Sequence, residues 1–241
     1  MIVKQEGLTY RGTKITVGDE PKLKRYLLNE CAKELDKWGF QEISMPVIQY
    51  KDTFSSKVGE ENRNMMLEVK DRSDRSLVLA PEYTAVIQKA ARILYPNKQR
   101  GKLFYIAECF RGENVQYGRY RQFTQLGVEI LNHPVDQASY LLTLARALIA
   151  HFYSPIDKTD FGQYLQPTFT VDTEAKRGLD YYLDPKTKLP GKGFEIHCDL
   201  LGTASQICGG GAYEGGQGFA LGIDRLLLLK EKVDARSFVV G

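Results

Sequence analysis

The sequence lacks any long apolar run, and this narrows the classes of protein that it can encode. Its 241 residues contain no uninterrupted apolar stretch of about 18 residues, the length that a membrane-spanning helix needs. Residues 1–6 already include Lys4 and Glu6 and contain no apolar core of a secretion signal. We therefore expect a protein that does not enter the membrane and that works in the cytoplasm.

Cysteine and histidine are also scarce, with four and three residues in the chain. The cysteines form no CxxC pair and have no histidines gathered around them; they are Cys31, Cys109, Cys198 and Cys208. Small buried side chains are therefore favoured over a disulfide framework or a metal site, and no metal ligand is assigned. The formal net charge of +3 is too small to indicate a dedicated nucleic-acid binder.

Composition and pattern predict a single domain over residues 1–241. Hydrophobic residues make up 43% of the chain and charged residues 26%, which is ordinary for a globular protein. No internal repeat, low-complexity tract or linker-like shift interrupts the sequence. At this length the chain can bury one large core.

Helical and strand patterns alternate without a strict order. An apolar residue recurs at every fourth position from Leu23 to Leu35, which predicts a helix over 21–38, capped by Asp19 and ended by Gly39. This succession of elements predicts an α+β fold with a mainly antiparallel sheet. Further helices are predicted at 81–94, 137–152 and 218–230, and strands at 40–47, 77–79, 102–110, 121–131, 169–172, 181–183, 193–198 and 205–208.

The hairpin predicted from strands 102–110 and 121–131 carries an unusual set of polar side chains. Strand alternation places five residues of its second strand on one face, namely Arg121, Phe123, Gln125, Gly127 and Glu129. An arginine, an amide and a carboxylate make an odd core, and Gly127 would leave room for a ligand. We interpret this face as the floor of a polar pocket; a solvated sheet face with cross-strand ion pairs is the alternative.

The same hairpin resembles motif 2 of class II aminoacyl-tRNA synthetases. FRGE at residues 110–113 and GRYRQFTQLGVEIL at 118–131 are similar, in the second strand, to the motif of histidyl-tRNA synthetases. The resemblance implies that Arg111 grips the α-phosphate of ATP, that Glu113 contacts the adenine and that Arg119 reaches the outer phosphates. A guanidinium suits these roles because it pairs bidentately with phosphate and keeps its charge.

A second resemblance lies in RGLDYY at residues 177–182, which matches a signature of histidyl-tRNA synthetases letter for letter. It implies that Arg177 acts in place of a metal, stabilising charge on the α-phosphate as the amino-acid carboxylate attacks. Tyr181 and Tyr182 would line the imidazole pocket. A turn followed by an aromatic-rich strand is the alternative, and it leaves Arg177 unexplained.

A third resemblance lies in GFALGIDRL at residues 218–226, which is similar to motif 3, a strand and helix whose arginine, here Arg225, binds the γ-phosphate. Pairing of this arginine with a buried acid is the alternative. The preceding glycine run, 209–211, is typical of backbone that closely approaches a ligand or a strand. With APEYT at 80–84, the resemblance covers about residues 10–230.

Together these motifs imply a class II fold with six to seven mainly antiparallel strands flanked by helices, and a homodimer formed through the motif 1 region, residues 21–46. The implied catalytic residues are Arg111 and Arg177. The implied ATP-binding residues are Arg111, Glu113, Arg119, Phe123 and Arg225. The implied histidine-binding residues are Glu82, Thr84, Gln125, Glu129, Tyr181, Tyr182 and Tyr213, with Glu82, Thr84 and Glu129 holding the ammonium group and Gln125 the α-phosphate side.

The chain also departs from the family pattern. Residues 130–176 leave no room for the family's insertion domain, and the few residues after Lys230 leave none for its anticodon-binding domain, so we expect neither. Around Ala212 the family has an arginine, which affects part of the histidine pocket.

We therefore expect formation of histidyl-adenylate from ATP, with Mg²⁺ as cofactor. Transfer to tRNA(His) or to another acceptor is left open. The alternative is a non-catalytic histidine sensor, similar to the regulatory subunit of ATP phosphoribosyltransferase. Such a sensor has no use for Arg111, Arg177 and Arg225 together.

Overall fold

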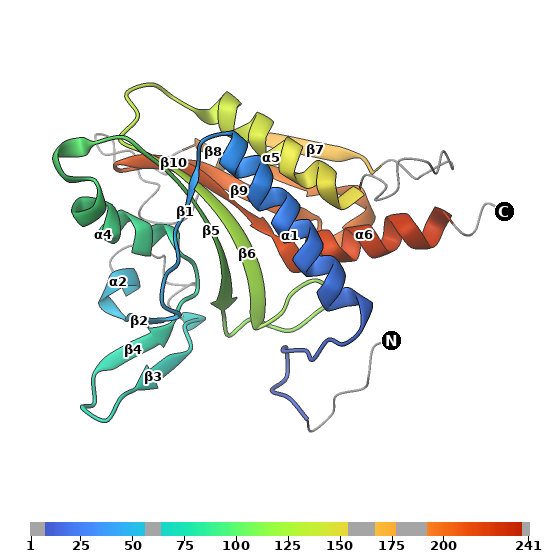
Figure 1. The fold of residues 1–241 in the computed structure, drawn as a ribbon. Coiled ribbons are helices and arrows are strands. Elements are labelled where there is room, and N and C mark those ends of the chain that lie inside the picture. Colours follow the sequence, from blue (N-terminus) through green and yellow to red (C-terminus); the bar gives the residue numbers. More distant parts are fainter. Residues whose placement is uncertain (1–7, 56–63, 154–166, 177–191, 238–241) are drawn as a thin grey trace.

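A seven-stranded sheet forms the centre of the computed structural model, which describes residues 8–55, 64–153, 167–176 and 192–237 (Figure 1). The strand order in these ranges is β1-β5-β6-β10-β9-β8-β7, and every neighbouring pair is antiparallel except β1 with β5. The predicted α+β fold with a mainly antiparallel sheet is confirmed. The strands are β1 (Gln41–Glu42), β5 (Gly101–Phe110), β6 (Gln122–Leu131), β7 (Phe169–Lys176), β8 (Lys192–Cys198), β9 (Gln206–Tyr213) and β10 (Gly216–Gly222).

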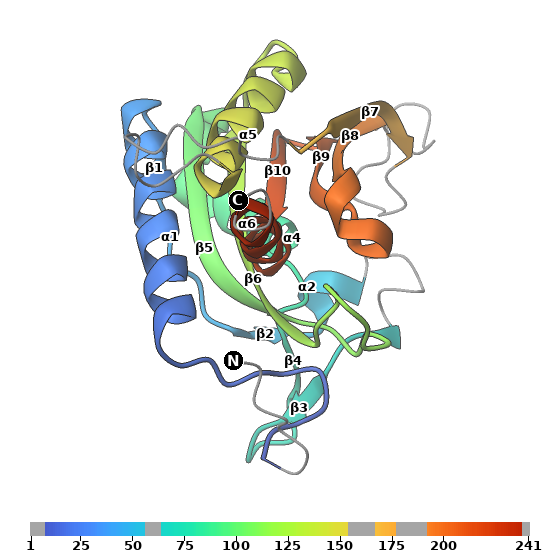
Figure 2. The same ribbon diagram turned by 90° about the vertical axis from the view of Figure 1, so that its right-hand side faces the viewer.

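One face of the sheet is covered by three helices, α1 (Asp19–Lys37), α5 (Ala138–Tyr153) and α6 (Ile223–Ser237) (Figure 2). The predicted apolar stripe of α1 faces the sheet, since Leu27, Cys31 and Leu35 are buried in the same core as Leu126 and Val128 of β6. Burying a side chain of this size stabilises the fold by about 1.5–3 kcal/mol. The three helices and this face of the sheet therefore enclose one large hydrophobic core.

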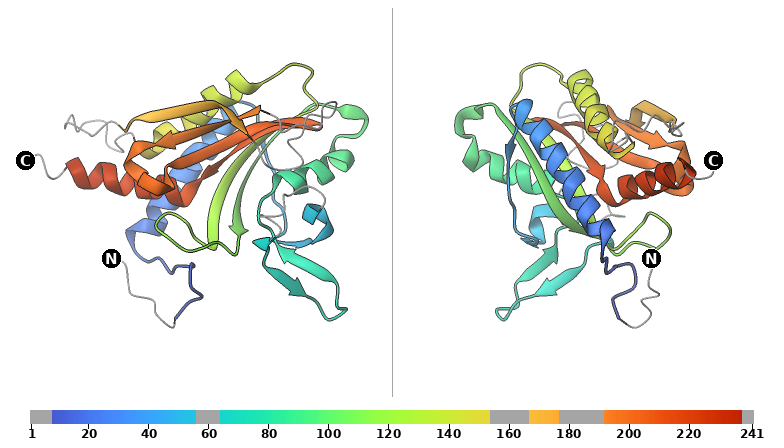
Figure 3. Two further views of the ribbon diagram at one scale, coloured as in Figure 1. Left: turned by 180° about the vertical axis from the view of Figure 1, so that it is seen from behind. Right: turned by 45° about the vertical axis from the view of Figure 1, so that its right-hand side comes forward.

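The other face of the sheet meets α4 (Thr84–Leu94), the short helix α2 (Asp52–Ser55) and a small sheet of order β2-β4-β3 (Figure 3). Phe54, Val78 and Tyr83 from these elements pack with Leu103 and Tyr105 of β5. The candidate site lies on this face. The remaining elements are β2 (Ile48–Tyr50), β3 (Glu68–Lys70), β4 (Ser76–Leu79) and the 3₁₀ helices η1 (Pro96–Lys98) and η3 (Asp199–Ala204).

Two predicted helices have different boundaries in the structure. The segment predicted as a helix over 218–230 is a strand up to Gly222 and a helix from Ile223, because β10 pairs with β6 on one side and β9 on the other. A short apolar run does not by itself distinguish a strand from a helix. The helix predicted from Pro81 begins at Thr84, because the Glu82 carboxylate accepts the backbone N–H groups of Thr84 and Ala85.

Two smaller predictions are also corrected. Of the strand predicted over 40–47, only Gln41–Glu42 pairs with the sheet. Asp19 is the first residue of α1 rather than its cap; Gly18, with φ of 82°, occupies the cap position. The strand predicted at 181–183 lies outside the described residues.

The four cysteines are all buried and unpaired, as predicted from their spacing. No helix in the described ranges combines the length and the apolar character that crossing a membrane requires.

Candidate functional site

A cavity of ≈ 180 Å³ opens where the loop between β5 and β6 meets the end of β10 and the first turn of α6. Among the described residues, its walls carry three arginines and two carboxylates, those of Glu113 and Asp224. This charge balance favours an anionic ligand. The lining residues are Arg111, Glu113, Gly118, Arg119, Tyr120, Phe123, Thr124, Gln125, Gln206, Ile207, Cys208, Gly209, Ala220, Gly222, Asp224 and Arg225.

Arg111 is oriented by two contacts that leave its positive charge unneutralised. Its Nε donates a hydrogen bond of 2.9 Å to the carbonyl oxygen of Pro81, and its guanidinium carbon lies 5.1 Å from the centre of the Phe123 ring. In the described part of the chain no carboxylate lies within ion-pair distance of it. A guanidinium held in this way can present its terminal N–H groups to a phosphate.

Arg225 is held by backbone carbonyls and not by the buried acid that the sequence left open as an alternative. Its Nε donates to the Gly118 carbonyl at 2.9 Å and its Nη1 to the Gln206 carbonyl at 2.6 Å. Burial, together with the charges of Arg119 and Arg111, lowers the pKa of Arg225. An anion in the cavity would relieve this mutual repulsion, which is what an oxyanion-binding site requires.

Arg119 lies beside Glu113 at the open side of the cavity. The two side chains form an ion pair with an Nη1 to Oε2 distance of 3.8 Å, and Arg119 is 44% exposed. A pair this long and this exposed contributes little stability. Both groups can therefore turn toward a ligand at small energetic cost.

A second polar group, centred on Glu129, lies further along β6 on the same face of the sheet. Its Oε1 accepts a hydrogen bond of 2.9 Å from the hydroxyl of Thr84, and its Oε2 accepts one of 2.6 Å from the phenol of Tyr213. Burial raises the pKa of Glu129 to about 8, a shift that the two hydrogen bonds oppose and that the nearby Glu82 charge increases. An arriving cation would stabilise the ionised form.

Glu82 lies at the start of α4, next to Thr84, where it plays a structural role that the sequence analysis did not predict. Its carboxylate accepts the N–H groups of Thr84 at 2.7 Å and Ala85 at 3.1 Å, in the first turn of the helix. Negative charge is favoured there by the helix dipole. These hydrogen bonds position Thr84, and the Thr84 hydroxyl in turn holds the Glu129 carboxyl.

The glycines of the site face make room for protein side chains as well as for a ligand. A Cβ on Gly218 would lie 2.1 Å from Glu129 Oε2, and one on Gly127 would lie 2.1 Å from the Tyr105 ring. Gly127 therefore accommodates Tyr105, contrary to the expectation that it leaves space for a ligand. The open space at the cavity floor comes instead from Gly209, Ala220 and Gly222.

Gln125 connects the arginine cavity to the Glu129 group, because it lies between Phe123 and Glu129 on one face of β6. Its Oε1 accepts a hydrogen bond of 3.2 Å from the thiol of Cys109. Burial raises the pKa of Cys109, so the thiol keeps its proton and remains a donor. The side-chain N–H groups of Gln125 are thereby left for a negatively charged partner.

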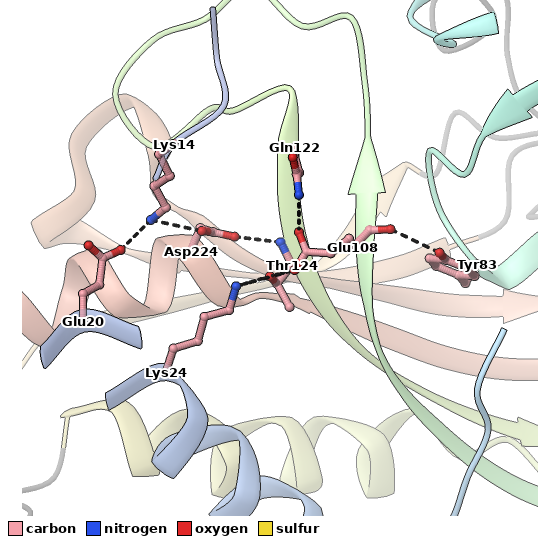
Figure 4. A network of polar contacts seen from close by, with 8 residues as sticks. All are labelled: Lys14, Glu20, Lys24, Tyr83, Glu108, Gln122, Thr124 and Asp224. Atoms are coloured by element: carbon pink, nitrogen blue, oxygen red, sulfur yellow. Dashed lines mark hydrogen bonds and ion pairs between the residues drawn. The ribbon is translucent and has the colours of Figure 1, made fainter. Parts of the chain in front are cut away.

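A charged network on the helix side of the hairpin was also missed by the sequence analysis (Figure 4). Glu108 accepts a hydrogen bond of 2.6 Å from Thr124, and Lys24 of α1 contacts both of these residues. Asp224 accepts the Thr124 backbone N–H at 2.7 Å. Asp224 directly precedes Arg225 in the sequence. This adjacency is the one sequence signal that could have indicated a place for Asp224 near the site.

The structure therefore brings together nine of the predicted residues, in the arginine cavity and the adjoining Glu129 group. They are Glu82, Thr84, Arg111, Glu113, Arg119, Phe123, Gln125, Glu129 and Arg225. Tyr213 joins them through its bond to Glu129. Arg177, Tyr181 and Tyr182 lie outside the described residues. Within the described residues, no group of three His, Cys, Asp or Glu side chains gathers as a metal site.

The antiparallel sheet with helices on one face and an arginine-lined cavity on the other matches the fold of class II aminoacyl-tRNA synthetases. The apo histidyl-tRNA synthetase of S. aureus superposes with a TM-score of 0.64 at 24% identity, over 94% of this chain and 70% of that one. An ATP phosphoribosyltransferase regulatory subunit/histidyl-tRNA synthetase of Bacillus halodurans superposes with a TM-score of 0.67 at 16% identity, over 97% and 84%.

Sequence comparison then defines the family. The model of the histidyl-tRNA synthetase family matches residues 19–155, which is more than half of the chain. A histidine–tRNA ligase of Clostridioides difficile is 28% identical, covering 92% of this chain and 74% of its relative. The chain belongs to the histidyl-tRNA synthetase family.

Proposed function

We propose that this protein activates histidine as an adenylate. A histidine carboxylate oxygen attacks the α-phosphorus of ATP, the bond between the α-phosphorus and its bridging oxygen breaks, and pyrophosphate leaves. The observation that carries the proposal is the continuity of the two groups on one face of β6, with the arginine cavity at Phe123 and the Glu129 group six residues along the strand. Adenylate formation needs an anion site directly beside an ammonium site, because only four bonds separate the α-phosphorus from the ammonium nitrogen of the adenylate. Gln125, which lies between Phe123 and Glu129 on this face, joins the two groups.

In this proposal the arginines stabilise the negative charge of the reacting phosphates. Arg111 contacts the α-phosphate, Arg119 and Arg225 hold the leaving pyrophosphate, and Glu113 and Phe123 complete the ATP site. Fixed cations suit this chemistry because nucleotidyl transfer depends mainly on positioning and electrostatic stabilisation. Arg177 acts with Arg111 on the α-phosphate; this assignment rests on the RGLDYY signature.

The amino acid binds at the Glu129 end of the site. Glu82, Thr84 and Glu129 orient the ammonium group, and Gln125 directs its N–H groups to the side of the α-phosphate. Tyr213 orients Glu129 and, with Tyr181 and Tyr182, bounds the imidazole. The neighbouring Ala212 replaces the family's arginine, so recognition of the imidazole rests on these tyrosines.

Mg²⁺ is the cofactor that the family implies, and it would screen the outer phosphates of ATP. The described residues offer no cluster of ligands for a resident ion, and Glu113 is engaged with Arg119. The phosphate oxygens themselves would therefore carry the ion. For the acceptor and the assembly we propose tRNA(His) and a homodimer formed through the motif 1 region, and we propose action in the cytoplasm; family membership supports all three.

The alternative function is a histidine sensor without catalysis. The cavity argues against it, because a sensor of histidine alone would have no need for three arginines with only partial neutralisation. Histidine-dependent exchange of labelled pyrophosphate into ATP tests the proposal. Exchange with histidine and with no other amino acid is expected, and no exchange with any amino acid would contradict adenylation. Exchange without charging of total tRNA would contradict only the proposed acceptor.

A further inference from the structure

The chain near the N-terminus, residues 10–14, lies against the loop that carries Arg111 and Arg119. The Gly12 carbonyl accepts the backbone N–H of Arg121 at 2.7 Å, and the Arg11 carbonyl accepts Nη1 of Arg121 at 3.3 Å. The Tyr10 ring lies 4.9 Å from the guanidinium carbon of the same arginine. Residues 10–14 therefore contact the end of this loop through both backbone and side chain.

Gly12 meets two conditions that exclude other residues at the point of contact. Its φ is 88°, and a Cβ would lie 2.6 Å from Val115 and 2.9 Å from Arg121. An L side chain is strained at this φ and would displace the loop as well. The close approach of the two segments depends on this position.

Lys14 links the same segment to Glu20 and to Asp224, which lines the arginine cavity (Figure 4). Its Nζ lies 3.2 Å from Oδ1 of Asp224 in α6, 2.8 Å from Oε1 of Glu20 in α1, and 5.2 Å from the centre of the Tyr120 ring in the loop. Asp224 and Tyr120 both line the cavity, while Lys14 does not.

The ion pair with Lys14 also compensates the negative charge that Asp224 would otherwise present to the cavity. One oxygen of Asp224 faces Lys14 and the other accepts the Thr124 N–H. Without Lys14, Asp224 would add an uncompensated negative charge to the wall of an anion site. Partial burial lowers the pKa of Lys14, but the hydrogen bond to Glu20 and the charge of Asp224 raise it to a net value above its ordinary one, so the cation persists at neutral pH.

We propose that residues 10–14 form a positioning latch for the ATP site, in which Gly12 fixes the loop at residues 111–121 and Lys14 neutralises Asp224. This inference rests on the proposed function, since it assigns the cavity to the phosphates of ATP. Lys14 is a positioning residue: it acts on ATP through Asp224 and Tyr120, at a distance from the histidine end of the site.

The kinetic test compares Lys14→Ala with Lys14→Arg and with the exposed control Lys70→Ala in pyrophosphate exchange. Lys14→Ala should raise the KM for ATP about tenfold and leave the KM for histidine unchanged, Lys14→Arg should restore most of the loss, and Lys70→Ala should match the wild type. Adding Asp224→Asn to Lys14→Ala should recover part of the ATP affinity, because it removes the unpaired charge. Equal effects on both KM values, or none, would overturn the proposal.

Hydrogen exchange tests the latch without relying on catalysis. In the absence of ATP, Gly12→Ala and Lys14→Ala should speed amide exchange in peptides from 111–121, while peptides from α5 stay unchanged. If the wild type shows no pyrophosphate exchange, the proposed function fails, and this measurement still decides on the latch. Unchanged amide exchange at residues 111–121 in both variants would overturn the proposed latch. If either variant does not fold, Lys14→Met replaces it in the same comparison.

Discussion

The phenol of Tyr213 donates a hydrogen bond of 2.6 Å to the carboxyl group of Glu129, and this contact joins β9 to β6 across the intervening strand β10. Glu129 is 1% exposed, and the hydroxyl of Thr84 contacts its other oxygen. A carboxyl group so enclosed makes the unliganded protein sensitive to pH.

The pH dependence of stability should reveal Glu129. Burial raises the pKa of Glu129 from its ordinary value of 4.5 to about 8, so the folded state binds more protons than the unfolded state between these pH values. The contribution of this group to the free energy of unfolding should therefore fall by about 1 kcal/mol per pH unit across that window. Urea unfolding at pH 5–8 of the wild type and of Glu129→Gln measures it. The same slope in both proteins would contradict the assignment.

Tyr213→Phe should weaken the binding of histidine more than that of ATP. The change removes a bond that favours the ionised form of Glu129, so the pKa of Glu129 should rise further and less carboxylate would be available at neutral pH. We expect the KM for histidine to rise about tenfold in pyrophosphate exchange. An equal rise in the KM for ATP would count against separate ends of the site.

Arg225→Lys should impair activation nearly as much as Arg225→Ala. A lysine cannot reproduce the geometry in which Nε and Nη1 donate to the carbonyls of Gly118 and Gln206. Loss of one such charge typically lowers the rate by a factor of about 100 or more. Arg72→Ala, at an exposed arginine between β3 and β4, is the matched control and should retain full exchange activity. Full activity of Arg225→Lys would show that charge alone suffices.

Two glycines of β10 should respond differently to alanine. A Cβ on Gly218 would collide with Glu129, so Gly218→Ala should lower the free energy of unfolding by about 1–3 kcal/mol. A Cβ on Gly222 would have its nearest neighbour at 3.8 Å, so Gly222→Ala should fold normally. Because Gly222 lines the cavity, its variant should nevertheless bind ATP more weakly. Thermal unfolding with and without ATP separates the two effects.

Cys109→Ser should preserve activity, whereas Cys109→Val should reduce it. Serine keeps a donor for Oε1 of Gln125, but valine leaves the amide free to rotate and to present an oxygen to a negatively charged ligand. We expect a several-fold lower kcat for the valine variant at unchanged stability, measured by exchange and by thermal unfolding. Identical kinetics for both variants would show that the Cys109 thiol does not orient Gln125.

The sequence predicted the faces of β6 because strand alternation is a local property. Phe123, Gln125 and Glu129 lie on the site face and Val128 lies on the opposite one, as the pattern indicated. Thr124 was predicted on the opposite face, but it also lines the cavity next to Asp224. Arg121 is the exception: it precedes the strand and donates to the Glu113 carbonyl at 3.1 Å. Its position depends on the loop, where alternation no longer applies.

Contacts between distant segments could not be predicted in this way. Nothing near Gly127 in the sequence indicates that Tyr105 occupies the space above it, because that contact depends on the register of β5 with β6. Lys14 likewise meets Asp224 only in the folded chain. The roles of Arg177, Tyr181 and Tyr182 stay predictions, since these residues lie outside the described parts.

The order of strands has a consequence for how the site forms. Strands β6 and β10 are neighbours in the sheet, although residues 132–215 separate them in the chain. Arg111 and Arg119 lie in the loop that precedes β6, and Arg225 follows β10, so the cavity is complete only after this long-range pairing has formed. Such pairings are slow, because a long loop must close before they can form. A polyphosphate bound across the junction would hold the two halves together, so ATP should slow unfolding at this junction first.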